Sequence, residues 1–514
     1  GKVDIEKLPI GDPTLSAKEI VGNESQERMG LLIKEHDVEQ LERVAKRERA
    51  PMYVVGESTD DHHFTFTQKN SKPIDLDLAD MLGNPPKTVI RDERVPVHYQ
   101  SVPAATEHLE AILEKLLRIE SVACKDWLTN KVDRSVTGRV AKQQCCGHLQ
   151  LPLNNLGVMA LDFSGTYGIA TALGHAPVAG LIDPAHASVL SIAEALTNIV
   201  WAPLTEGLDS VSLSANWMWP SKNKGEDARL YTAVEAASCF AKDLGINIPT
   251  GKDSLSMTQK YPDGKVVYAP GTVIISAVGE VSDVKKTLSP VLRLEENTEL
   301  LYVDFSADEM RLGGSVYAQI YNYLGNDTPT VKDASYFKKA FNAIQQLVAG
   351  SYILAGHDIS AGGLITALLE MTFADDRVSL DVDLQEMPEQ LFEKVLFAEN
   401  PAVLIQVRKS DKVKEFLQAQ GLRVFGLGTP HAKRHHPSLQ LRLANQSFNL
   451  NIDHYRDIWY ETSFLLDCRQ SGEEKAQERY DNYKSQQLGY VFPKGFIGKA
   501  VTTNRKVNAA ILRE

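Results

Sequence analysis

Between residues 136 and 285, short apolar runs alternate with stretches of helical periodicity, and no other feature of the chain constrains the fold as strongly. The apolar runs at 158–163 and 273–278 have the length of single strands, whereas residues 187–200 and 227–243 repeat apolar side chains at helical spacing. Strands and long helices that alternate in this way pack in layers around a shared core. The sequence therefore predicts an α+β fold.

A polar connection at residues 288–297 leads into a second region of the same kind. It begins with an apolar strand at 300–303 and continues through helices and strands to about residue 430. Beyond that point the chain is basic, polar and rich in Tyr, a composition typical of a tail or linker. We therefore expect two folded domains, followed by a tail over residues 431–514.

Composition and charge exclude several classes of protein. The 514 residues include 55 Lys and Arg against 67 Asp and Glu, which gives a net charge of −12. Such an acidic balance disfavours a broad surface for nucleic acid or for an anionic membrane. No apolar run approaches the roughly 20 residues that span a bilayer. The five cysteines form neither a disulfide framework nor a paired metal motif. We expect a soluble cytoplasmic protein without a nucleic-acid or membrane partner.

The helix predicted at residues 187–200 carries an unusual polar face. Glu194 and Asn198 lie one turn apart, opposite the apolar side, among small residues rather than the Lys and Arg of a solvated face. Carboxylate and carbonyl oxygens at this spacing are ligands that Mg²⁺ prefers. A lone pair of this kind is usually structural, so the face indicates either a metal site or an ordinary packing contact.

A second polar segment lies between an apolar strand and an apolar helix, at residues 355–363. Asp358 stands at the end of the strand, where a carboxylate is well placed to bind a cation. Ser360 is followed closely by two glycines, which allow backbone N–H groups to approach a phosphate at a helix N-terminus. The alternative is that Asp358 or Ser360 merely caps the helix.

Two further segments concentrate polar groups. In residues 250–257, Gly251 permits a close backbone approach, Lys252 can meet a phosphate, and Ser254 can donate to a polar substrate; the alternative is a hairpin turn with a surface Lys. The spacing is not that of a Walker A loop. Residues 22–28 are also rich in donors and acceptors, although such a cluster is typically a solvated loop.

Taken together, seven strings of the chain resemble one family, the large single-chain phosphoribosylformylglycinamidine synthases of purine biosynthesis. The strings occur in the order expected for that family, at residues 14–20, 22–28, 133–138, 194–198, 213–218, 251–257 and 357–363. The resemblance implies one half of a PurM-like synthetase, made of an N-terminal-type A2 domain and a C-terminal-type B2 domain. Its implied borders are the end of a preceding B1 domain at 1–48, A2 at 49–295, B2 at 296–430 and a linker at 431–514.

The resemblance also implies a reaction and missing partners. The family is an ATP-dependent carbon–nitrogen ligase that activates the formamide oxygen of formylglycinamide ribonucleotide and replaces it with ammonia from glutamine. The chain begins without Met and ends in an apolar run at 507–512, so we expect a fragment. Its A1, B1 and glutaminase domains would lie elsewhere in the full protein, and the fragment alone is expected to be inactive.

Site residues follow from the same resemblance, and none of them is assigned as catalytic. The positions that match substrate contacts are Glu24, Ser25, Gln26 and Ser254. The positions that match contacts to ATP or ADP are Asn154, Ser360, Gly251 and Lys252. The positions that match Mg²⁺ ligands of an auxiliary nucleotide site are Glu194, Asn198, Asp358 and Asn155. The family has Asp where this chain has Asn155, so one ligand keeps its carbonyl oxygen but loses its charge.

Two alternatives to the ligase stay open. This half can be chiefly a structural scaffold whose nucleotide site does not turn over, or the chain can belong to another ATP-dependent synthetase of the PurM superfamily. The resemblance further implies that A2 pairs with A1 across an apolar face. Without A1, the fragment is expected to form a two-fold homodimer through that face.

Overall fold

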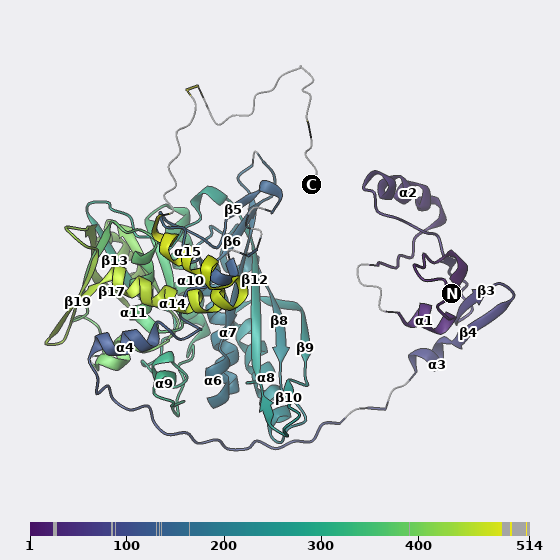
Figure 1. Cartoon of the computed structure of the whole chain (residues 1–514), viewed down its shortest axis with the longest axis horizontal. Coiled ribbons are helices and arrows are strands. Elements are labelled where there is room, and N and C mark those ends of the chain that lie inside the picture. The colour runs from purple at the N-terminus through teal and green to yellow at the C-terminus, as the bar shows by residue number, and fades with distance from the viewer. Residues whose placement is uncertain are drawn as a thin grey trace. The chain divides into compact units, whose positions relative to one another are not determined.

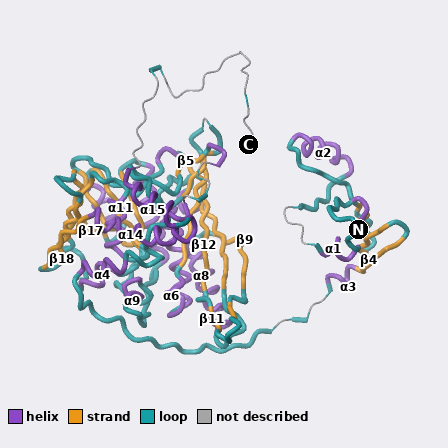
Figure 2. The backbone as a smooth tube through the Cα atoms, viewed as in Figure 1, coloured by secondary structure: helices purple, strands orange, loops and turns teal. Residues whose placement is uncertain are grey.

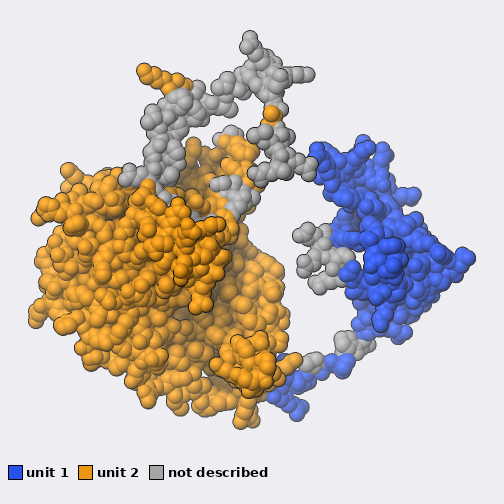
Figure 3. Space-filling view, viewed as in Figure 1, with its two compact units in different colours: residues 1–91 blue, residues 92–514 orange. Residues whose placement is uncertain are grey.

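The computed structural model divides the chain into two compact units, Gly1–Arg91 and Asp92–Glu514 (Figure 3). It describes residues 1–23, 28–83, 86–87, 89–129, 131–132, 134, 136–163, 165–389, 391–485, 494–495 and 510. In these residues, no helix combines the length and the apolarity that crossing a bilayer requires.

The first unit is built on a small four-stranded sheet in the order β2-β1-β3-β4. Its elements are β1 (Lys2–Asp4), α1 (Ala17–Gly22), α2 (Val38–Arg47), β2 (Gly56–Glu57), β3 (His63–Gln68), β4 (Ser71–Asp77) and α3 (Leu78–Leu82). Strand β1 pairs with β2 on one side and with β3 on the other. The border predicted between residues 48 and 49 therefore falls inside this unit, because one sheet joins the segments on both of its sides.

A six-stranded sheet forms the first layer of the second unit, in the order β5-β6-β7-β12-β8-β9 (Figure 2). Its strands are β5 (Val140–Lys142), β6 (Gly157–Ala160), β7 (Gly168–His175), β8 (Val211–Met218), β9 (Asn247–Ser254) and β12 (Thr272–Val281). The strands β10 (Thr258–Lys260) and β11 (Val266–Tyr268) form a separate ribbon. Residues along β7 alternate between buried and exposed, so only one face of this sheet is covered.

Three helices accompany this sheet: α6 (Pro177–Ile182), α7 (Pro184–Ile199) and α8 (Glu226–Leu244). Helix α7 lies so close to β7 that a Cβ atom added to Gly174 would stand 2.2 Å from the carbonyl oxygen of Ser191. Only glycine allows this approach. The helices predicted at 187–200 and 227–243 are confirmed as α7 and α8.

A seven-stranded sheet forms the rest of the unit, in the order β14-β16-β13-β17-β15-β18-β19 (Figure 1). Its strands are β13 (Thr298–Asp304), β14 (Ile353–Ile359), β15 (Val378–Asp383), β16 (Ala402–Arg408), β17 (Val424–Ala432), β18 (Ser438–Leu443) and β19 (Gln446–Asn451). The remaining helices are α4 (Leu109–Leu116), α5 (Asp126–Thr129), α9 (Val316–Ile320), α10 (Ala334–Ala349), α11 (Gly363–Phe373), α12 (Phe392–Phe397), α13 (Ser410–Ala419), α14 (Ile452–Ser471) and α15 (Glu473–Asn482).

The region predicted as a tail is folded as far as residue 485. It supplies two strands of the large sheet, β18 and β19, and the long helix α14. Trp459 and Tyr460 of α14 are buried, and Arg456 Nε donates to the carbonyl oxygen of Phe373 at 2.8 Å. Composition concealed this packing, because the Tyr, Trp and Arg side chains that make the segment look polar are the ones that it buries.

Candidate functional site

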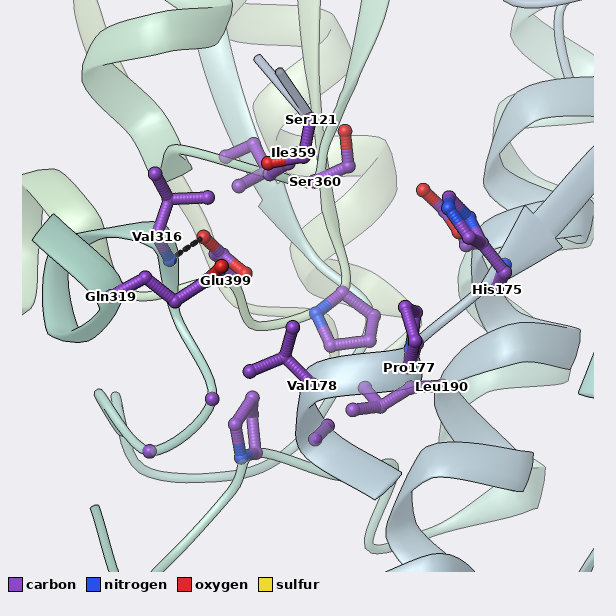
Figure 4. Close-up of a pocket in the computed structure, with 18 of the residues that line it drawn as sticks. Ser121, His175, Pro177, Val178, Leu190, Val316, Gln319, Ile359, Ser360 and Glu399 are labelled. Atoms are coloured by element: carbon purple, nitrogen blue, oxygen red, sulfur yellow. Dashed lines mark hydrogen bonds and ion pairs between the residues drawn. The ribbon is translucent and has the colours of Figure 1, made fainter. Parts of the chain in front are cut away.

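A pocket with a cavity volume of about 140 Å³, partly open to solvent, lies in the second unit between the α6–α7 region and loops of the large sheet (Figure 4). Its polar lining includes His175 at the end of β7 and Glu194 on α7. It also includes Ser360, which follows β14, and Glu399, which precedes β16. Its apolar lining includes Pro177, Val178, Leu190, Val316 and Ile359. A concave site with a mostly apolar wall and a few convergent polar groups is the usual form of a small-molecule site.

Three of the four predicted metal ligands meet beside this pocket. Asn155 comes from the loop between β5 and β6, Asn198 from α7 and Asp358 from the end of β14. The Asn155 Nδ2 group donates to Asn198 Oδ1 at 2.8 Å and also to Asp358 Oδ1. The fold thus brings together side chains that are more than 200 residues apart in the sequence.

Glu194, the fourth predicted ligand, is engaged at the end of β7. Its Oε2 atom accepts a hydrogen bond from the backbone N–H of His175 at 2.6 Å and lies 3.4 Å from His175 Nδ1. The hydrogen bond to Glu194 raises the pKa of the His175 side chain. Glu194 therefore connects helix α7 to the last residue of strand β7 as well as lining the pocket.

A buried histidine, which the sequence did not single out, contacts this cluster. His357 Nδ1 lies 3.0 Å from Asp358 Oδ1, and its Nε2 lies 3.1 Å from Glu370 Oε2 on α11. Burial disfavours the charged ring, but the two carboxylates prevail and raise the pKa of His357 to about 10. The two carboxylates therefore favour the protonated form of the His357 ring.

The oxygen donors of this cluster fit a hard cation such as Mg²⁺, but they carry less negative charge than a set of carboxylates would. Among the described residues, the buried oxygens Asp358 Oδ2 and Asn155 Oδ1 have no hydrogen-bond partner, and both are of the type that Mg²⁺ prefers. The described residues contain no group of three His, Cys, Asp or Glu side chains that could together hold a metal ion. The site thus offers one free carboxylate oxygen and one free amide oxygen, in place of a cluster of acids.

Two of the four residues predicted to contact ATP or ADP, Ser360 and Asn154, have different surroundings. Ser360 lines the pocket, at a turn where Gly362 and Gly363 have φ values of 88° and 71°. Such left-handed conformations favour glycine. Asn154 Nδ2 instead donates to the carbonyl oxygens of Gln143, at 2.6 Å, and Cys145, at 3.2 Å. Asn154 therefore holds the loop that presents Asn155.

Gly251, Lys252 and Ser254 lie on the edge strand β9, so the hairpin turn considered for them is wrong. A Cβ atom added to Gly251 would stand 2.1 Å from the carbonyl oxygen of Ala215, so glycine is needed for β9 to pair with β8. None of the three lines the pocket at Ser360. Glu24, Ser25 and Gln26 lie outside the described residues.

The register of the six-stranded sheet nevertheless shows how far Lys252 lies from the pocket. Lys252 stands opposite Asn216, Asn216 opposite Ile274, and Ile274 opposite His175, which lines the pocket. Four residues in one row point to the same face of the sheet, and three strand spacings amount to about 14 Å. Lys252 therefore shares a face of the six-stranded sheet with His175 but does not line the pocket.

Glu399 is a pocket residue that sequence reasoning missed. Its Oε1 atom accepts hydrogen bonds of 2.8 Å from the backbone N–H groups of Val316 and Gly362, the first of which is drawn in Figure 4. Burial raises the pKa of Glu399 to about 7. No spacing motif could identify this residue, because its two donors lie 83 and 37 residues away.

Two family models match the chain. Residues 124–280 match the FGAR-AT PurM N-like domain, and residues 1–69 and 301–436 match the C-terminal domain of proteins related to AIR synthase. These are the two domain types predicted for the A2 and B2 regions. The fold class of a PurM-like synthetase half is thereby confirmed.

Relatives match over the whole chain. The probable phosphoribosylformylglycinamidine synthase of Arabidopsis thaliana is 35% identical over 100% of this chain and 38% of its own length. The phosphoribosylformylglycinamidine synthase of Homo sapiens is 37% identical over 99% of this chain and 40% of its own length. Among solved structures, Thermotoga maritima PurL complexed with FGAR shares the fold with a TM-score of 0.51 and 13% identity, covering 68% of this chain and 53% of that one.

The chain thus spans about two-fifths of the length of the curated relatives that it matches. The match extends through both domain types and through the segment after residue 436 that no family model covers. The chain belongs to the phosphoribosylformylglycinamidine synthase family.

Proposed function

We propose that this chain is the A2–B2 part of an ATP-dependent phosphoribosylformylglycinamidine synthase. In the whole protein, ATP would phosphorylate the formamide oxygen of formylglycinamide ribonucleotide. Ammonia from glutamine would then displace the phosphate, giving the amidine, ADP and inorganic phosphate. The observation that carries the proposal is the match to synthases of this name over 99–100% of the chain. A match of that extent also disfavours another synthetase of the PurM superfamily.

The pocket at Ser360 is proposed as the nucleotide site of this half. Glycine-rich backbone at residues 362–363 allows N–H groups to approach phosphate oxygens, and the Ser360 hydroxyl lies at the same turn. Asp358, Asn155, Asn198 and Glu194 would hold Mg²⁺ beside it. When bound, Mg²⁺ would neutralise the charge of the phosphates. These residues would hold the nucleotide beside helix α7 and the turn that follows β14.

One observation favours a structural rather than a catalytic role for this nucleotide. The amide of Asn155 already bridges Asn198 and Asp358, so this part of the cluster is held together by hydrogen bonds of the protein. A tightly held nucleotide at this site would fix the two domain types of the half, while turnover would require the other half of the synthetase. We therefore propose a scaffold role for the isolated chain and a ligase role for the whole protein.

The uncovered face of the six-stranded sheet is proposed as the surface that pairs with A1. Met159, Ile169, Leu173 and Val278 are exposed on that face, and Leu173 retains 60% of its accessible surface. A row of large apolar side chains on a sheet normally packs against a partner. Without A1, a second copy would occupy this face. Leu173→Lys should then convert a dimer into a monomer in light scattering, whereas a monomeric wild-type chain would contradict this pairing.

Two measurements test the nucleotide proposal. Mass spectrometry of the denatured chain should release ADP or ATP that co-purifies with it, and calorimetry should show one Mg²⁺-dependent nucleotide site. An assay of ammonia-dependent amidine formation should detect activity only after the remaining synthetase half is added. Activity of the 514-residue chain alone would overturn the domain assignment. The substrate contacts assigned to Ser254 and residues 24–26, the nucleotide contacts of Gly251, Lys252 and Asn154, and the cytoplasmic location stay predictions.

A further inference from the structure

A second pocket of the second unit has a different chemistry and shares no lining residue with the first. It lies where the connection after β12 meets the segment after α11 and the loop that follows β5. Its lining residues are Lys142, Gly147, Thr287, Ser289, Val291, Leu292, Arg293, Leu294, Leu354, Asp375 and Arg377. Three of these side chains are cations and one is an acid.

Two of the three cations are not neutralised. Lys142 is partly buried, and its Nζ donates to the hydroxyl of Ser289 at 2.9 Å. Among the described residues, neither Lys142 nor Arg293 has a carboxylate within 4.0 Å, and burial lowers the pKa of Lys142. Arg377 differs from them because it forms two hydrogen bonds to Asp375, of 2.8 and 2.5 Å. The pocket therefore has two cations that no carboxylate contacts, the partly buried Lys142 and the exposed Arg293, in a protein whose net charge is −12.

A buried hydroxyl lines the same pocket without a partner. Thr287 is 9% exposed, and its Oγ1 has no hydrogen-bond partner among the described residues. A polar group that is buried and unpaired costs free energy, so such groups normally mark a missing water, ion or ligand. The Thr287 hydroxyl can donate a hydrogen bond, as can the side chains of Lys142 and Arg293. Three donors of this kind, two of them charged, complement an oxyanion.

We propose that this second pocket binds a phosphate group through Lys142, Arg293 and Thr287. A phosphate has three or more acceptor oxygens and close to two negative charges, so it can satisfy three donors and both unbalanced cations at once. A monocarboxylate would leave one charge unpaired. The phosphate can be inorganic phosphate or the phosphoryl group of a small sugar phosphate, and the proposal does not rest on the function proposed for the first pocket.

Calorimetry on the 514-residue chain in a low-chloride buffer tests this site with inorganic phosphate as the probe. We expect saturable binding that Lys142→Met weakens by about tenfold or more, because a charge-assisted hydrogen bond is lost. Arg293→Met removes an exposed side chain and should weaken binding to a similar degree without affecting folding. Lys433→Met is the matched control, since Lys433 pairs with Asp376 and does not line the pocket. It should bind phosphate as the wild type does.

Ribose 5-phosphate distinguishes the two sources of the phosphate. Tighter binding of the sugar phosphate, lost in Lys142→Met, would assign the site to a phosphate ester, whereas tighter binding of inorganic phosphate would assign it to the free ion. Equal affinity of the wild type and both pocket variants would mean an adventitious ion only and would overturn the proposal. The absence of saturable binding by either probe would also overturn it.

Discussion

The two pockets of the second unit are lined by groups of opposite charge. The first collects carboxylates, with Glu194 and Glu399 in its lining and Asp358 beside it. The second collects cations, with Lys142 and Arg293 left without acidic partners in the described part of the chain. In both, the surrounding protein neutralises only part of the charge. The remainder is the basis of the two proposals, a cation with its nucleotide for the first pocket and an oxyanion for the second.

The strongest test of this comparison is Asp358→Ala. The substitution removes the buried carboxylate that has a free oxygen, and it leaves the His357 cation with Glu370 alone. We expect a loss of Mg²⁺-dependent ADP binding of more than about 100-fold, and a loss of stability of about 3–5 kcal/mol because a buried charge loses its partner. Calorimetry and urea denaturation measure the two effects.

Asp358→Asn serves as the control for shape in that experiment. It keeps the volume of the side chain and one oxygen, so any loss of binding that it shows reports the charge. Equal ADP affinity in the wild type and in Asp358→Ala would mean that the turn at residues 355–363 only caps a helix.

Glu399 gives the second test, through the pH dependence of stability. Its pKa is raised to about 7 in the folded chain, against an ordinary value near 4.5. The folded state therefore holds this proton more tightly than the unfolded state does. The stabilising contribution of Glu399 is fully present below pH 4.5 and is lost as the pH rises through about 7. Its upper bound is about 3 kcal/mol.

Glu399→Gln should remove this dependence, because Gln keeps the acceptor oxygen for Val316 and Gly362 but does not ionise. We expect the melting temperature of the variant to fall less than that of the wild type between pH 5 and pH 8. Parallel melting curves over that range would show that Glu399 ionises freely and that the first pocket does not penalise its charge.

Asn155→Asp sharpens the comparison by adding an acid to the first pocket. One more charge contact with a cation is worth on the order of 4 kcal/mol gross at an effective dielectric of 20, and desolvation cancels most of it. We expect Mg²⁺-dependent ADP binding to tighten by about tenfold, which corresponds to about 1.4 kcal/mol. Calorimetry at several Mg²⁺ concentrations checks this, and unchanged affinity at all of them would remove Asn155 from the ligand set.

The smallest expected effect belongs to Thr287→Val in the second pocket. The hydroxyl that it removes has no partner in the described structure, and Val has nearly the same shape. Replacing an unpaired buried polar group with an apolar one is neutral or stabilising, so the free energy of unfolding should stay within about 1 kcal/mol of the wild type or rise. A loss of 2 kcal/mol or more in urea denaturation would mean that the hydroxyl has a partner in solution.

The sequence predicted elements well where their information is local. The period of apolar residues identified α7, and its polar face placed Glu194 and Asn198 on one side. Contacts across the fold were not accessible in the same way. Glu370 meets His357 only because α11 turns back along β14, and nothing in the composition after residue 430 shows that α14 packs on Phe373. Residues that act through distant partners have no spacing to reveal them.

The folded C-terminal segment affects how this protein can be made in pieces. Synthesis proceeds from the N-terminus, so β18, β19 and α14 leave the ribosome after the other five strands of the large sheet. A chain cut at residue 430, where the composition changes, would leave β15 as an open sheet edge, since β18 is its second neighbour. It would also expose the aromatic ring of Phe373, which packs against the Trp459 ring in a tilted arrangement. Open edges and exposed aromatic surface promote aggregation. Truncated versions that end at residue 430 should therefore accumulate in inclusion bodies, while versions that extend to residue 485 should fold.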